Sequence, residues 1–274
     1  MPHSSAPDPD PAPGLVTIGR AAKKATLGGH TQVIVPLSGD SQSLIGQVQA
    51  MATCRADIVE WRADTFLSSL VGAHFVSASD VGEDLVSMAR YVADASPLPI
   101  LATIRTSVEG GEASLDDEEY CALVTALAPH VGGVDVEIRR DGSSALIEDA
   151  HVAGALVIGS FHDFEGTPSD DRLAEVLADM NYAGADVLKF ACMAHSATDA
   201  ARVLGAQAWA REAYDRPVIG IAMGPNGAPT RLVGSALGSA ATFATLPGAE
   251  GSAPGQFTIE QARAVLDIVE GSEA

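Results

Sequence analysis

The stretch PILATIRTSVEGGEASLDDEEYCALVTALAPHVGGVDVEIR, residues 99–139, carries the pattern on which the fold of this chain depends. It opens with an apolar, β-branched run at 99–105 and closes with another at 133–139, as buried parallel strands require. Between them, residues 116–127 repeat apolar side chains at helical spacing. A strand, a helix and a second strand in this order predict one parallel βαβ unit.

The same unit recurs along most of the chain. The strand-like runs lie at 32–37, 57–62, 99–105, 133–139, 154–160, 185–191, 217–223 and 241–245. The clearest helical segments lie at 83–95, 116–127, 170–180, 197–214 and 259–269. Eight such repeats over about 240 residues predict an α/β fold, a closed (β/α)₈ barrel, in a single domain. An open doubly wound sheet is the alternative, but it normally carries a G-x-G-x-x-G fingerprint, which this sequence lacks.

The N-terminal segment does not follow this rhythm. Residues 1–14 are rich in Pro, Ser and Asp and predict a disordered tail, because they cannot bury enough apolar surface to offset the entropy of ordering. Residues 15–30 contain two β-like pieces, LVTI and ATL, and predict a short hairpin ahead of the barrel. The barrel domain as a whole is therefore expected over 15–274.

The charge balance excludes some partners. There are 36 acidic and 16 basic residues, a formal net charge of −20. This argues against nucleic acid and against an anionic membrane surface, because both need clustered cations. Any anionic substrate must therefore be held by local cations.

Other features of the composition bear on location and cofactors. Three cysteines without a C-x-x-C pair favour a reducing compartment, and neither a membrane-spanning run nor the apolar core of a signal peptide is present. The expectation is a cytoplasmic protein. The sequence has no H-E-x-x-H and no C-x-x-C spacing, so no zinc site is expected.

Polar residues interrupt the apolar runs where the strands should end. They are Glu60, Arg62, Arg105, Asp135, Glu137, His162, Asp163 and Lys189. In a barrel the carboxyl ends of the strands converge on one mouth, where barrel enzymes place their sites. The alternative is a network of salt bridges that closes the barrel top. That alternative is weaker for the whole set, because a buried isolated lysine is costly to keep charged.

Lys189 is the most informative of these residues. The chain contains three lysines against thirteen arginines, and the other two lysines, Lys23 and Lys24, lie far away in the sequence. Burial and nearby cations such as Arg62 or Arg105 would lower the pKa of Lys189 and leave a fraction of neutral amine, which can attack a carbonyl. Arginine stays protonated and could not do this. An ion-paired or snorkelling lysine is the alternative.

Five positions join Lys189 in a candidate site. His162, at a strand end, suits general acid–base work near neutral pH. Glu109, in the loop VEGGE, is expected to hydrogen-bond this imidazole and set its tautomer. Arg231 opens a predicted helix and can bind a carboxylate with its planar fork. Ser252 and Gln256 lie in a Gly/Pro-rich segment, 247–256, which reads as a mobile lid or as an ordinary surface loop.

Several separated motifs together resemble the type I 3-dehydroquinate dehydratase family, (β/α)₈ enzymes of the shikimate pathway that supplies aromatic amino acids. The motifs are VPLSG (35–39), DIVEWRAD (57–64), TIRTSVEGGE (103–112), VDVEIR (134–139), GSFHDFEGTP (159–168), GADVLKFA (184–191), GIAMG…TRLVGSALGSAATF (220–243) and SAPGQ (252–256). The resemblance extends from about residue 31 to residue 270. It implies syn elimination of water from 3-dehydroquinate to give 3-dehydroshikimate, without a cofactor and commonly in a homodimer.

The resemblance also implies a role for each candidate residue. Lys189 matches the lysine that forms a Schiff base with the substrate ketone. His162 matches the general base and acid, and Glu109 matches the carboxylate that orients it. Arg231 matches the residue that pairs with the substrate carboxylate. The residues that match substrate-binding and lid positions are Glu60, Arg62, Arg105, Ser252 and Gln256.

Some features depart from the family pattern, and two other functions stay open. Thr230 stands where Ser is more usual, and the loop at 224–229 lacks the charge expected there. The first alternative function is another Schiff-base barrel enzyme, a class I aldolase. The second is a non-catalytic barrel that binds an anionic polyol.

Overall fold

The computed structural model describes residues 14–73, 78–246, 248 and 255–271. The tail predicted over 1–14 lies outside the described residues except for its last position, and so does most of the predicted lid. Within the described ranges, none of the helices combines the length and the apolar character needed to cross a membrane.

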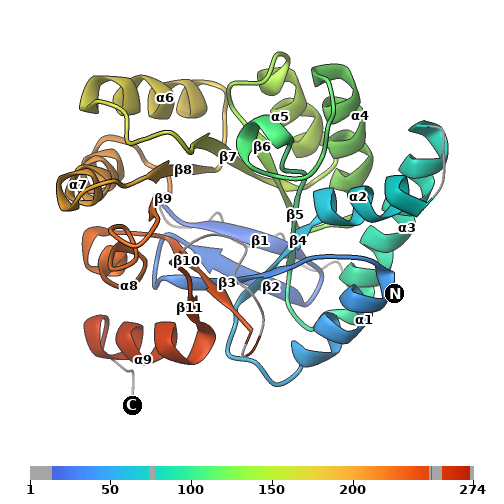
Figure 1. The fold of residues 1–274 in the computed structure, drawn as a ribbon, viewed down its shortest axis with the longest axis horizontal. Helices are drawn as coiled ribbons and strands as arrows, with labels where there is room; N and C mark the ends of the chain where they lie inside the picture. Colours follow the sequence, from blue (N-terminus) through green and yellow to red (C-terminus); the bar gives the residue numbers. More distant parts are fainter. Residues whose placement is uncertain (1–13, 74–77, 247, 249–254, 272–274) are drawn as a thin grey trace, which may run out of the picture.

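Parallel strands form one curled sheet, surrounded by helices (Figure 1). The strands are β3 (Gln32–Leu37), β4 (Ile58–Arg62), β5 (Ile100–Thr103), β6 (Gly133–Glu137), β7 (Leu156–Asp163), β8 (Val187–Met193), β9 (Val218–Met223), β10 (Ala241–Thr245) and β11 (Phe257–Thr258). Their order is β11-β10-β3-β4-β5-β6-β7-β8-β9. An isolated parallel bridge joins Val218 to Ser239, and the Ala240 amide donates to the Val218 carbonyl at 2.8 Å. These contacts bring β9 to the segment entering β10, which gives the predicted barrel arrangement.

The helices lie outside the sheet, and all but the last, which follows β11, lie between successive strands of the chain. They are α1 (Ser41–Ala50), α2 (Ala63–Ala73), α3 (Ala78–Ala95), α4 (Asp117–Leu127), α5 (Ser143–Val152), α6 (Asp170–Tyr182), α7 (Ala197–Ala213), α8 (Thr230–Val233) and α9 (Ile259–Val269), with 3₁₀ turns η1 (Ser107–Glu109), η2 (Ala128–His130) and η3 (Gly234–Leu237). Local sequence sets their starts. The Ser169 side chain accepts from the Arg172 amide to begin α6, and Thr258 and Gln261 form a capping box at α9.

The period of two along each strand separates two apolar clusters. Outward-facing side chains such as Val59, Trp61 and Leu188 pack beneath the helices. Inward-facing side chains near the start of each strand fill the barrel, as Ile58 and Val187 do. Farther along the same inner faces the side chains become polar. The barrel interior is therefore apolar near the start of the strands and polar at the mouth, where the strands end.

A hairpin closes the opposite end of the barrel. It pairs β1 (Val16–Arg20) with β2 (Lys23–Leu27) in antiparallel register, in agreement with the hairpin predicted near 15–30. Its Ile18 and Leu27 join the inner cluster, and it lies across the barrel in blue in Figure 1. The Arg20 guanidinium donates to the carbonyls of Val131, Ala128 and Ala153 at 2.6, 2.9 and 2.8 Å, which anchors the hairpin to the barrel.

Candidate active site

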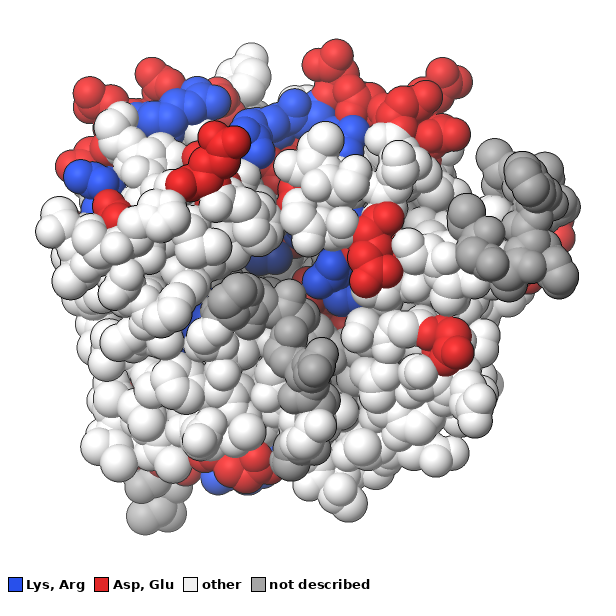
Figure 2. Space-filling model, viewed as in Figure 1, with Lys and Arg blue, Asp and Glu red and all other residues white. Residues whose placement is uncertain are grey.

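A pocket of about 220 Å³ lies at the carboxyl ends of the strands. Its lining residues are Glu60, Arg62, Thr103, Arg105, Glu109, Gly110, His162, Phe164, Lys189, Ala191, Ile221, Met223, Arg231, Phe243 and Gln256. Figure 2 shows Lys and Arg side chains in a hollow near the centre of the view. Eight of the nine candidate residues therefore meet here, and the ninth, Ser252, lies outside the described residues.

Lys189 points into this pocket from the inner face of β8. Its side chain is buried, and Nζ donates to Oδ2 of Asp135 at 2.8 Å. Nζ also lies 4.9 Å from the centre of the Phe243 ring. The ion-paired alternative thus describes part of its environment, but the amine still borders the pocket.

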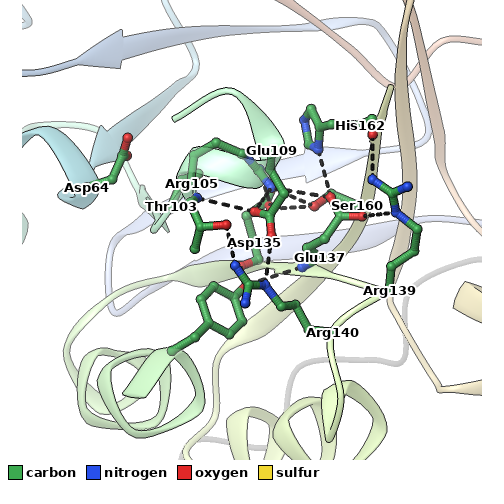
Figure 3. Close-up of polar contacts among 12 residues, drawn as sticks. Asp64, Thr103, Arg105, Glu109, Asp135, Glu137, Arg139, Arg140, Ser160 and His162 are labelled. Carbon is green, nitrogen blue, oxygen red and sulfur yellow. Dashed lines mark hydrogen bonds and ion pairs between the residues drawn. The ribbon is translucent and has the colours of Figure 1, made fainter. Parts of the chain in front are cut away.

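Asp135 is a buried carboxylate that binds two of the pocket-lining residues, Lys189 and Arg105. Its Oδ1 accepts from Arg105 and from the Ser160 hydroxyl, both at 2.5 Å (Figure 3). Burial alone would raise the pKa of Asp135, but the charges of Arg105 and Lys189 outweigh burial and hold that pKa well below its usual range. The ionised Asp135 therefore holds Nζ of Lys189 in position through this hydrogen bond.

His162 lies near the end of β7 with its ring buried in the pocket wall. Its Nδ1 is 2.9 Å from Oε2 of Glu137. Burial, reinforced by the charges of Arg105 and Lys189, lowers the pKa of His162 well below 6.5, so the ring is neutral at physiological pH. Burial raises the pKa of Glu137 to about 7.

The sequence predicted that Glu109 hydrogen-bonds His162, but the carboxylate of Glu109 has other partners in the structure. Its Oε1 accepts from Nε of Arg140 at 2.8 Å, and its Oε2 accepts from the Thr106 amide at 3.3 Å. A capping box in η1 turns the carboxylate back toward Thr106, and Arg140 reaches it from beyond β6. The expectation that Glu109 orients His162 is therefore wrong for this structure, in which Glu137 occupies that position.

Glu60 and Arg62 form another side of the pocket, on β4. The Thr103 hydroxyl donates to Glu60 at 2.9 Å. Arg62 binds both carboxylate oxygens of Asp64, at 2.8 and 2.7 Å. Both residues share the inner face of the strand, as the period of two predicted.

Arg231 lines the pocket from α8, the short helix between β9 and β10. Burial lowers the pKa of Arg231 to about 10, and the side chain stays cationic at neutral pH. The helix that was expected to begin here is present but has only four residues, so it contributes little dipole. Gln256 also lines the pocket.

The sequence reading gave no role to several residues that organise this pocket. They are Asp135, Glu137, Arg139, Arg140 and Ser160. Asp135 and Glu137 carried a signal, since both are charged and share one face of a buried strand. Arg139 and Arg140 follow that strand and carried no comparable signal, because a charged pair after a strand is usually solvated.

Known proteins of one family are similar to this chain in sequence. The model of the type I 3-dehydroquinase family matches residues 33–273. The 3-dehydroquinate dehydratase of Klebsiella pneumoniae is 36% identical over 247 residues, covering 88% of this chain and 94% of that protein. Its counterpart from Bacillus velezensis is also 36% identical, covering 88% and 93%.

Solved structures resemble this one closely. The 3-dehydroquinate dehydratase from Geobacillus kaustophilus has a TM-score of 0.84 at 30% identity, covering 96% of this chain and 98% of that chain. The type I 3-dehydroquinate dehydratase from Clostridium difficile, solved with covalently modified comenic acid, has a TM-score of 0.82 at 29% identity, covering 95% and 100%.

Proposed function

This chain belongs to the type I 3-dehydroquinase family, and from that premise we propose that its mouth pocket removes water from 3-dehydroquinate through a lysine imine. The product is 3-dehydroshikimate, which makes the enzyme a hydro-lyase of the shikimate pathway. The observation that carries the proposal is the pairing, in one pocket, of a buried lysine amine with a neutral histidine.

The first step is attack of the Lys189 amine on the C3 ketone. Water leaves as the C=N bond forms, and Asp135 aims the amine from 2.8 Å. The protonated imine then draws electrons from the neighbouring carbon and makes the C2 proton easier to remove. The Clostridium difficile relative, solved with a covalently modified ligand, supports a pocket of this kind that forms covalent bonds.

His162 is the acid–base group in this proposal. With Nδ1 directed at Glu137, Nε2 is the nitrogen available to the substrate. Nε2 removes the C2 proton, and the electrons move toward the imine. The same proton then passes to the C1 hydroxyl, which departs as water. Hydrolysis of the imine releases the product and returns Lys189.

The remaining residues hold the substrate. Arg231, buried and cationic, pairs with its carboxylate. Glu60 and Arg62 hold hydroxyl groups from β4, and Arg105 organises the floor, since its guanidinium is already engaged by Asp135. Gln256 and Ser252 are assigned to the segment that closes over the substrate.

Incubation with 3-dehydroquinate tests this proposal by growth of the conjugated enone absorbance. Borohydride should trap an adduct on Lys189, and Lys189→Ala should lose both turnover and adduct. His162→Ala should keep the adduct and lose about 10²–10⁴-fold in turnover. An aldolase would instead cleave a C–C bond, and a binding protein would form no adduct.

We also propose that the protein is a cytoplasmic homodimer. The free cysteines Cys54, Cys121 and Cys192 support a reducing compartment. The family resemblance supports the dimer, as do exposed apolar side chains such as Val152 and Tyr182. Sedimentation equilibrium of the full chain tests it, and a monomer across the concentration range would contradict it.

A further inference from the structure

Arg139 contacts both members of the His162–Glu137 pair. Its Nε donates to Oε1 of Glu137 at 3.3 Å, while Oε2 of the same carboxylate faces Nδ1 of His162 at 2.9 Å. Nη2 of Arg139 also donates to the backbone carbonyl of His162 at 2.8 Å. The guanidinium lies 4.6 Å above the Phe161 ring, which restricts its orientation. Figure 3 shows Arg139 beside this pair.

The accessibility of the three side chains differs sharply. Glu137 and His162 are buried, whereas the Arg139 side chain is 45% exposed. Arg139 therefore connects the buried pair to the outside of the barrel. A substitution there removes a charge without emptying space in the core.

The charges facing the pair come from several elements. Besides Arg139, those near Glu137 are Arg105 after β5, Glu109 in η1 and Asp135 on β6; those near His162 are Arg105, Asp135, Lys189 on β8 and Arg62 on β4. The Tyr120 hydroxyl from α4 accepts from the Glu137 amide at 3.2 Å. Arg105 binds Asp135 at 2.5 Å, and its distance to the Glu137 carboxylate is 3.7 Å. The distance from Arg139 to the same carboxylate is 3.3 Å, so Arg139 makes the shorter contact.

We propose that Arg139 is a positioning residue for the acid–base histidine: its charge favours the ionised form of Glu137, which holds the proton of His162 on Nδ1 and leaves the lone pair on Nε2. The inference rests on the acid–base role proposed for His162. An ionised Glu137 can only accept a hydrogen bond, so Nδ1 must donate. A protonated Glu137 would donate to Nδ1 instead, and Nε2 would then carry the hydrogen and could not remove a proton from the substrate.

Loss of Arg139 should therefore act through proton uptake by the pair. The cation of Arg139 favours the ionised carboxylate. Without it, the inactive form, in which Glu137 is protonated and the hydrogen of His162 is on Nε2, persists to higher pH. The acid limb of kcat/KM should move upward by about one pH unit, which is about a tenfold loss at neutral pH. Above the shifted limb, the rate should recover to within about threefold of the native value.

The experiment compares kcat/KM for 3-dehydroquinate from about pH 6 to about pH 9 in the full chain and four variants. Arg139→Met and Arg139→Gln both remove the charge, so one remains informative if the other does not fold. Arg139→Lys keeps the charge and should hold the limb near its native position. Arg172→Met is the matched control, since Arg172 is a half-exposed arginine on α6 that pairs with Glu175 at 3.0 Å. Borohydride trapping on Lys189 should be equal in all of them.

Each outcome decides the inference. A limb that moves upward in the two uncharged variants, but not in Arg139→Lys or Arg172→Met, supports it. A rate lowered by the same factor at every pH shows a structural effect only and overturns it, as does an unchanged profile. If the native chain and Arg172→Met themselves neither convert 3-dehydroquinate nor form the adduct, the proposed function fails first.

Discussion

Nδ1 of His162 lies 2.9 Å from Oε2 of Glu137, and this contact joins the ends of two neighbouring strands, β7 and β6. Both side chains are buried, and the shifts in their pKa values are opposite. Burial favours the neutral form of each, which lowers the pKa of the histidine and raises that of the carboxyl group. The neutral forms of both groups are therefore favoured over an imidazolium–carboxylate ion pair.

Glu137→Gln should lower kcat more than Glu109→Gln does. The amide can donate to Nδ1 and stabilise the wrong tautomer of His162, at a loss of about 10²–10⁴-fold. Glu109→Gln leaves that contact intact and should lose about tenfold or less, mainly through its pairing with Arg140. Steady-state kinetics at saturating 3-dehydroquinate measures both. A larger loss in Glu109→Gln would show that Glu109 turns toward His162 when substrate binds.

Glu137→Gln should also change how stability depends on pH. The lowered pKa of His162 contributes stability that is present above pH 6.5 and is lost as the pH falls. The reason is that the imidazole is protonated in the unfolded chain at a pH at which it is still neutral in the folded protein. Glu137 acts oppositely: its raised pKa contributes stability that is present below 4.5 and is lost as the pH rises through about 7.

These two contributions oppose each other in the native chain, and Glu137→Gln removes the second. The free energy of unfolding of the variant should therefore fall more steeply between about pH 7 and about pH 5, by an extra ~1–3 kcal/mol. Urea titrations at a series of pH values measure this slope. Equal slopes for the two proteins would contradict the assignment of the opposite shifts.

Arg231→Ala should raise KM far more than it lowers kcat. The guanidinium is buried at the pocket wall and stays charged at neutral pH, so it can hold the substrate carboxylate in the ground state and the transition state alike. A rise in KM of about 10²-fold is expected. Arg231→Lys should recover little, because an ammonium cannot make the bidentate contact. A variant with native KM and low kcat would point to a role in the chemical step.

Gly111→Ala should destabilise the loop that lines the pocket. A Cβ at this position would stand 2.1 Å from the Arg105 carbonyl oxygen, so backbone must move, at about 1–3 kcal/mol. Gly46 is the matched control, since it lies exposed in α1 with open space around a Cβ, and Gly46→Ala should stabilise by about 0.5–1 kcal/mol. Thermal unfolding compares the two, and a neutral Gly111→Ala would show that the loop adjusts freely.

Local sequence predicted the elements well because their signals are local. The strands at 32–37 and 241–245 and the helix at 259–269 have the bounds expected from apolar runs and caps. Elsewhere the ends moved: β7 continues to Asp163, beyond the expected end at 160, because hydrogen bonds with β8 extend the pairing. The long helix α3 likewise begins before the expected residue 83.

The sequence alone determined which side chains reach the mouth of the barrel. A strand alternates its faces, so the spacing of Glu60 and Arg62, and the place of Lys189 within an apolar run, assign these residues to the inner face. Tertiary structure decided which of the gathered charges meet. His162 pairs with Glu137 rather than Glu109 because neighbouring strands are in register, while η1 turns Glu109 toward Arg140. Periodicity gives the face of a residue, but contacts between residues far apart in the chain depend on register and loop geometry.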